Sequence, residues 1–164
     1  MLEDEGCESV IQAWLVTNNL FLSLCTSMYL GTGWSLALFS FPMASKLTPD
    51  NYYNQFVPQV TAATKFFTVM TTLMVASAIA MIIGEPSAWY RVLPGIVLAA
   101  VIAATLLTVV YILPDNRKMA AGITSQKELN TILRRWIFRN WMRVALWTLQ
   151  WAAMAVWFGL KLAQ

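Results

Sequence analysis

Four long runs of the chain carry no charged residue, and their length predicts the architecture. The runs are Phe21–Phe41, Phe66–Gly84, Val92–Leu113 and Val144–Leu160. A helix needs about 20 apolar residues to cross the hydrocarbon core of a bilayer, whereas a helix in a soluble protein averages about 11. Because lipid offers the backbone no hydrogen-bond partner, each run is expected to be helical.

The pattern therefore predicts an all-α fold, an integral membrane four-helix bundle that forms a single domain over residues 1–164. The expected spans cover about 18–41, 61–83, 90–113 and 140–161. Ser125 followed by Glu128 matches a capping box, which predicts a cytoplasmic helical extension over 126–139 ahead of the last span. A helix continuing from there to Leu162 would hold about 37 residues and measure about 55 Å.

Composition agrees with a membrane protein. Apolar residues make up 59% of the chain and charged residues 12%. In a soluble domain apolar residues make up about 45–50% and charged residues about 25%. The two cysteines are Cys7 in the N-terminal tail and Cys25 inside the first span, so neither a disulfide nor a cysteine metal site is expected. With no histidine in the chain, we expect no metal and no tightly held cofactor.

The basic residues are distributed asymmetrically between the two ends of the expected bundle. The 42–65 and 114–143 connections carry Lys46, Lys65, Arg117, Lys118, Lys127, Arg134, Arg135, Arg139 and Arg143. The opposite end has Arg91, Lys161 and an acidic tail with Glu3, Asp4, Glu5 and Glu8. The positive-inside rule then places both long connections in the cytoplasm and both termini on the outer side. A basic loop beside a membrane explains the net charge of +3, so no nucleic-acid partner is expected.

Three of the expected helices carry a stripe of polar or small residues. The fourth has Asn140, Arg143, Trp147, Gln150, Met154, Trp157 and Lys161, the first has Asn19, Ser23, Thr26, Gly33, Ala37 and Ser40, and the second has Thr61, Thr64, Thr68 and Thr71. Polar groups are costly in lipid, so these stripes should face the interior of the bundle. Two interpretations are open. The stripes are packing seams, or they line a cavity in which tryptophan rings stack on a small amphipathic ligand.

Several polar groups lie where the expected spans reach the cytoplasmic side. The candidate ligand-binding residues are Lys65, Asp115, Asn116, Asn140, Arg143, Trp147 and Gln150. A buried Arg143 needs an acidic partner, and Asp115 is the nearest one by topology. The alternative is an interfacial ion pair that only fixes the register of the helices.

Three short patches stand at the ends of these spans. They are Gly31–Pro42 (GTGWSLALFSFP), Leu113–Arg117 (LPDNR) and Trp136–Arg143 (WIFRNWMR). Together they resemble the anthrone oxygenase-like family of small four-helix membrane proteins, most of them uncharacterised bacterial proteins. The resemblance covers roughly residues 20–160 and implies the bacterial inner (cytoplasmic) membrane as the location.

Fungal members of that family insert oxygen into reduced polyketide rings without a metal or flavin. The resemblance implies a small aromatic or quinone-like ligand, with Asn116, Asn140 and Arg143 at the site and a cation, Arg143 or Lys65, stabilising the anion that reacts with oxygen. A different class remains open: a non-enzymatic accessory subunit, with other membrane protein subunits as partners besides the lipid bilayer. A transporter is less favoured, since no carboxylate lies in the middle of the spans.

Overall fold

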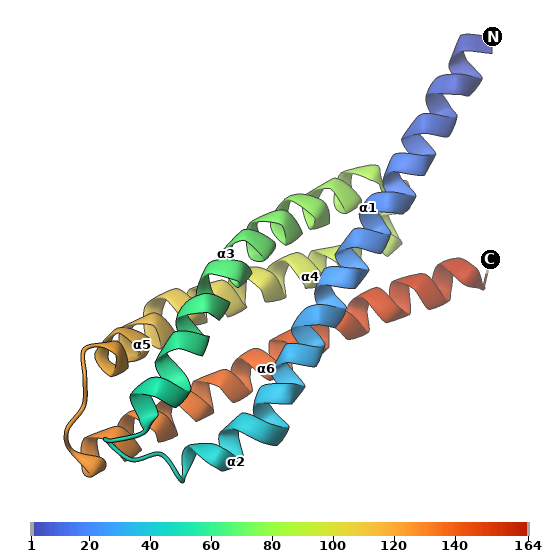
Figure 1. Ribbon diagram of the computed structural model, residues 1–164. Coiled ribbons are helices and arrows are strands. Elements are labelled where there is room, and N and C mark those ends of the chain that lie inside the picture. The colour runs from blue at the N-terminus through green and yellow to red at the C-terminus, as the bar shows by residue number, and fades with distance from the viewer. Residues whose placement is uncertain (1, 164) are drawn as a thin grey trace.

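The computed structural model describes residues 2–163, with side chains from residue 12 onward, and this part of the chain is helical without a strand. It forms four long columns, shown in Figure 1. The first joins α1 (Leu2–Ser35), η1 (Leu36–Ser40) and α2 (Phe41–Ala44); the second is α3 (Tyr52–Gly84); the third joins α4 (Ala88–Leu107), η2 (Thr108–Ile112) and α5 (Leu113–Ala120); the fourth is α6 (Gln126–Leu162). The acidic tail predicted to face outward (Glu3, Asp4, Glu5, Glu8) and Cys7 lie outside the described side chains.

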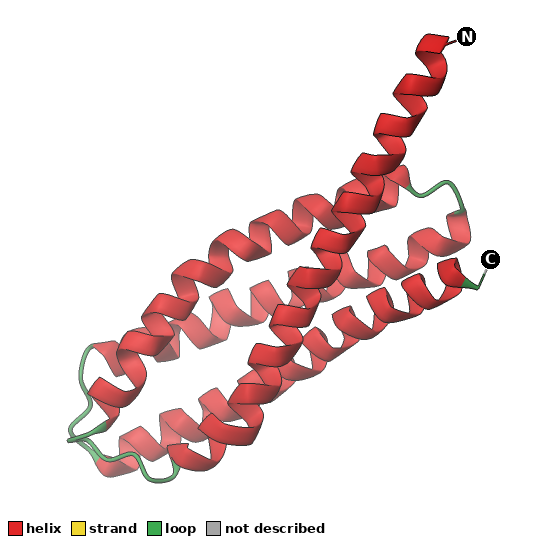
Figure 2. Cartoon of the chain, turned by 45° about the vertical axis from the view of Figure 1, so that its right-hand side comes forward, coloured by secondary structure: helices red, strands yellow, loops and turns green. Residues whose placement is uncertain are grey.

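The four columns are arranged as the corners of a square. α1 packs against α3 and α6, and α4 packs against the same two helices. Both ends of the chain lie at one end of the bundle, opposite the α2 and α5 turns (Figure 1). The first turns of α1 project beyond the other three columns (Figure 2). The all-α, four-helix part of the sequence prediction is confirmed.

The helix ends differ from the predicted spans in a consistent way. α3 begins at Tyr52, well before residue 61, and continues through Pro58. α6 runs from Gln126 to Leu162 over 37 residues, as the sequence predicted. Ser125 is its N-cap, but its side chain forms no capping hydrogen bond, so the box with Glu128 does not form. The helices extend beyond the apolar runs, because backbone hydrogen bonding continues wherever tertiary packing supports it.

Two of the four predicted spans have the length and hydropathy of a membrane helix. They are Tyr52–Gly84, with a mean hydropathy of 2.2, and Ala88–Ala120, with 2.8. Over the described residues α1 and α6 fall short of the same threshold, because Asn, Ser, Thr, Gln and Trp interrupt their apolar runs.

Two π-helical turns interrupt the first and third columns at equivalent places. η1 is followed by Pro42 and η2 by Pro114, each two residues beyond the end of the π turn. A proline lacks the N–H that would bond residue i−4, and its ring clashes with that carbonyl. The carbonyls concerned belong to Leu38 and Val110, inside the π turns. The wider π turn accommodates each proline without breaking the column.

Hydrogen bonds hold α3 to its neighbours near both of its ends. At the first turn the hydroxyl of Tyr52 donates to the Met119 carbonyl at 3.1 Å and accepts from the Ile123 N–H at 2.6 Å. At the far end Asn18 donates to the Ser77 carbonyl at 3.0 Å, and the Ser77 hydroxyl donates back to the Asn18 side chain at 2.8 Å. A further pair of hydrogen bonds ties the middle of α3 to α1.

The closest approach of α1 to α6 is at Gly33. A Cβ atom built on this glycine would lie 2.7 Å from Cε3 of Trp147 and 3.4 Å from the side chain of Val144. Gly33 therefore lets the two helices meet over the indole ring.

We expect Gly33→Ala to destabilise the protein, because the new methyl group must displace Trp147. Overpacking of this kind costs about 1–3 kcal/mol, and the gain in helix propensity offsets up to about 1 kcal/mol. Thermal unfolding in mild detergent measures the difference. Gly31→Ala is the matched control, since a Cβ at Gly31 meets nothing within 4 Å. Equal melting temperatures for the two variants would contradict the close approach.

Candidate functional site

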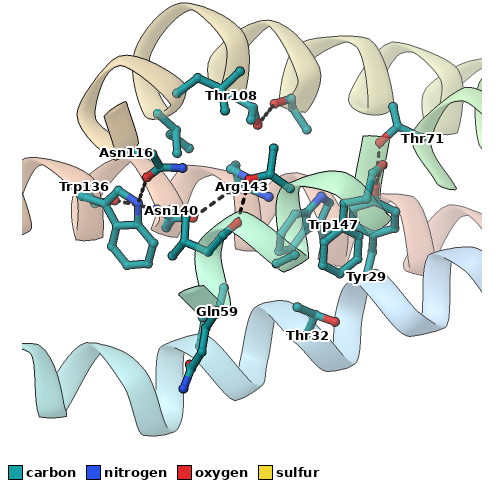
Figure 3. A pocket seen from close by; sticks show the side chains of 18 of the residues that line it. Tyr29, Thr32, Gln59, Thr71, Thr108, Asn116, Trp136, Asn140, Arg143 and Trp147 are labelled. Atoms are coloured by element: carbon teal, nitrogen blue, oxygen red, sulfur yellow. Dashed lines mark hydrogen bonds between the residues drawn. The ribbon is translucent and has the colours of Figure 1, made fainter. Parts of the chain in front are cut away.

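A cavity of about 500 Å³ lies between the four columns, in the half of the bundle that holds the two π turns. Every column contributes to its lining. The polar and aromatic side chains that define it include Tyr29, Phe67, Asn116, Asn140, Arg143 and Trp147. We call it the Arg143 cavity, and Figure 3 shows its interior.

Arg143 is the one charged side chain in the lining of this cavity among the described residues. Its Nη1 donates to Oδ1 of Asn140 at 3.0 Å, and its guanidinium lies over the ring of Trp147, 4.4 Å from the centroid. Its Nε is buried and has no hydrogen-bond partner. No ion pair with an acid is formed by Arg143 within the described part of the chain. A buried cation held only by an amide and a ring retains capacity for an anion.

An aromatic wall continues from Arg143. The ring centroids of Trp147 and Phe67 are 6.3 Å apart, and the two rings are stacked with an interplanar angle of 26°. The ring centroids of Trp147 and Tyr29 are 5.0 Å apart, and these rings are tilted. The hydroxyl of Tyr29 shares a 2.5 Å hydrogen bond with Thr71, so this ring is fixed in place (Figure 3). The wall presents flat apolar surface directly beside the guanidinium.

The floor of the cavity, at the end that holds α5, is a chain of hydrogen bonds. Trp136 donates from its indole N–H to Oδ1 of Asn116 at 3.0 Å. Asn140, which is 1% exposed, donates to the Trp136 carbonyl at 2.8 Å and accepts from Arg143. Figure 3 shows these residues in one row along α5 and α6. Both asparagines therefore orient their neighbours rather than stand free.

Asp115 is not the partner of Arg143, so the predicted ion pair is wrong. Its carboxylate, 3% exposed, accepts from Arg135 and from Arg139, both at 2.5 Å. These two arginines are four residues apart, so they share one face of α6 and both form ion pairs with the Asp115 carboxylate. Asp115 does not line the cavity. The hydrogen bond from Arg135 to Asp115 raises the pKa of that guanidinium, which keeps it charged at any physiological pH.

Lys65 also lies outside the cavity. It is exposed on α3, two positions from the lining residues Ala63 and Phe67. Three and seven positions after Lys65 come Thr68 and Thr72, which line the cavity at its exposed margin. Residues at these spacings share a helix face, so Lys65 lies beside that margin without lining the cavity.

Five of the seven candidate residues line one cavity. The cavity brings together Asn116, Asn140, Arg143, Trp147 and Gln150. Gln150 is 1% exposed, and its Oε1 has no partner. Sequence analysis missed Tyr29 and Phe67. Tyr29 lies three residues after Thr26 and four before Gly33, on the predicted inward stripe of the first helix, and that spacing could have identified it.

No known protein identifies this site. Neither the family models, the curated proteins nor the solved structures contain a match to the chain. Within the described part of the chain, no three acidic or cysteine side chains lie close enough together to hold a metal ion.

Asp115→Asn should destabilise the junction between α5 and α6, because two arginines lose their buried counter-charge. We expect a loss of about 1–3 kcal/mol, less than for a fully buried pair because Arg135 is partly exposed. Thermal unfolding in detergent measures it. Asp50→Asn is the control, since Asp50 is exposed and forms no ion pair among the described residues. Equal losses of stability in both variants would show that the two ion pairs of Asp115 do not stabilise the fold.

Proposed function

We propose that this chain is an integral membrane protein that binds a small, flat, monoanionic amphiphile in the Arg143 cavity. The observation that carries the proposal is a single guanidinium, without an acidic partner, set in an aromatic and apolar cavity of about 500 Å³. Ligand pockets in proteins are typically of this size, mostly apolar, and furnished with a few polar groups that orient the ligand.

The membrane location is supported by large apolar side chains that point outward on every column. Examples that are at least half exposed are Leu24 and Phe39 on the first column, Val69 and Ile83 on the second, Leu106 and Val109 on the third, and Phe138 and Val156 on the fourth. α1 and α6 share in this surface although they are less apolar overall. A soluble monomer rarely exposes apolar surface on this scale, whereas lipid-facing helices require it.

The exposed apolar surface forms a belt of the right height. On α6 it runs from Phe138 to Leu162, about 36 Å at 1.5 Å per residue. The hydrocarbon core of a bilayer is about 30 Å thick, and tilt accommodates the excess.

The charge distribution supports the predicted orientation. Beyond the belt, at the α2 and α5 end, the exposed basic residues are Lys46, Arg117, Lys118, Lys127 and Arg134. By the positive-inside rule this end is cytoplasmic, and both chain termini are on the outer side. Bacterial inner membranes are the setting that the family resemblance implies.

The ligand class follows from the buried cation of the site, which has no counter-ion. A buried cation without a counter-ion is costly, and an anionic oxygen near Arg143 supplies the missing interaction. The stacked rings of Trp147 and Phe67 favour a flat partner. An acidic phenol of the anthrone type meets both conditions as its phenolate. Oxygenation of such a ligand, in which anthrone and O₂ give anthraquinone and water, is the reaction to assay.

An accessory subunit is the alternative function. That interpretation predicts polar stripes filled by neighbouring side chains. The stripe on α6 instead borders an open cavity at Asn140, Arg143, Trp147 and Gln150, which favours a ligand-binding role over a purely structural one.

Arg143→Gln should weaken binding of an aromatic monoanion by about tenfold or more, equivalent to about 1.4 kcal/mol. Titration calorimetry in lipid nanodiscs with pyrenebutyrate measures this, with empty nanodiscs as the blank. The neutral analogue pyrenebutanol should bind weakly to both proteins, because it offers Arg143 no charge. Lys65→Gln is the control: it removes one exposed cation that does not line the cavity, and it should leave the affinity unchanged. Equal losses in both variants, or no binding to the wild type, would refute the proposal.

The orientation is tested by labelling single cysteines in intact cells with a membrane-impermeant maleimide. In a background with Cys7→Ser and Cys25→Ala, Ser87→Cys in the α3–α4 turn should react from outside. Ser125→Cys at the start of α6 should react only after the membrane is permeabilised. The reverse pattern would invert the topology, and labelling of both sites in intact cells would refute the membrane-spanning bundle.

A further inference from the structure

The Arg143 cavity reaches the surface at two places, one on each side of α3. Residues that both line the cavity and are exposed fall into two groups. What we call the glutamine opening lies between the end of the first column and α3 and consists of Ser40, Met43, Gln55, Gln59 and Ala63. Thr68, Thr72, Thr105 and Val109 form the threonine opening, between α3 and the α4–η2 junction. The two openings differ in position and in chemistry.

Their heights can be compared through ring contacts between α3 and α6. Phe56 meets Trp136 and Phe67 meets Trp147, and the two residues of each pair are 80 positions apart. The two helices therefore run parallel with a constant offset. Gln55 and Gln59 are level with residues 135 and 139 of α6, at the edge of the apolar belt that begins at Phe138.

The threonine opening lies inside the belt. By the same offset, Thr68 and Thr72 are level with residues 148 and 152 of α6. The exposed neighbours of the opening include the apolar residues Val69, Leu73, Leu106 and Val110, and Lys65 lies one turn before Thr68 on the same face of α3. A molecule at this height on the outside of the protein is in the hydrocarbon region.

The threonines make this opening apolar in spite of their hydroxyl groups. Thr68 donates to the Thr64 carbonyl at 2.8 Å, Thr72 to Thr68 at 3.1 Å and Thr105 to Val101 at 2.8 Å. Each hydroxyl is bonded to the carbonyl four residues earlier on its own helix. No free donor is left to hold water, and the methyl groups remain available to contact hydrocarbon.

We propose that the ligand enters from the bilayer through the threonine opening, so that the ligand class is a membrane-dissolved carboxylate or phenolate amphiphile. This inference rests on the proposed function. The anionic end reaches Arg143, and the flat part lies against Trp147. The glutamine opening connects the same cavity to the interface, where amide groups keep water.

The test is the rate of transfer of pyrenebutyrate from donor liposomes to protein in acceptor liposomes, followed by energy transfer from tryptophan to pyrene. Thr72→Phe and Thr105→Phe narrow the threonine opening and should slow uptake by about tenfold or more. They should leave the equilibrium affinity nearly unchanged, since entry and exit are slowed together. Gln59→Phe narrows the other opening and should leave the rate unchanged. Thr105→Val keeps the methyl groups and should behave like the wild type.

Slower uptake in Gln59→Phe with normal uptake in both threonine variants overturns the entry route while the proposed function stands. A wild type that binds no probe overturns both. A second measurement does not depend on the variants. A diazirine fatty acid dissolved in the bilayer should photolabel the wild type within 68–72 or 105–109, and pyrenebutyrate should compete. Labelling confined to 55–59 would refute entry through the threonine opening.

Discussion

The indole of Trp147 is the point where three columns of the bundle meet, and the cavity depends on it. It fills the space above Gly33 of α1, stacks on Phe67 of α3 and carries the guanidinium of Arg143 on its face. A cation in an apolar interior is tolerated only where something replaces its hydration. Trp147 and Asn140 supply part of that replacement, and the remaining deficit is the basis of the proposed selectivity for an anion.

The cavity exists because the columns do not close around this group. Two π turns, each followed by a proline, interrupt the first and third columns at the same end of the bundle. π turns are frequent at functional sites because they displace a side chain or open space without ending the helix. Around the cavity the hydrogen bonds of Trp136, Asn116 and Asn140 are internally satisfied, so the unmet polar capacity is concentrated at Arg143 and Gln150.

Much of the fold could be predicted from the sequence because charge-free runs and helical spacing are local signals. The 37-residue α6 and the inward stripe through Asn140, Trp147 and Gln150 follow directly from periodicity. The partner of Asp115 could not be predicted in this way. Arg135, Arg139 and Arg143 share one helical face, and only the height at which α5 ends decides which of them Asp115 meets. Likewise, the orientation of Lys65 depends on the rotation of α3, which polar spacing on an irregular, proline-containing helix does not specify.

The anchoring of α3 has a mechanical consequence. The helix is fixed at Tyr52 by α5 and the turn after it, at Ser77 by α1, and between these points by the hydroxyl of Tyr29. A helix held at three points resists collapse into the space behind it. The cavity beside Arg143 is therefore preformed, and a ligand needs little of its binding energy to open it. Loosening the anchor at Tyr52 or at Ser77 would weaken ligand binding through the conformational entropy lost on ordering α3, without removing a contact to the ligand.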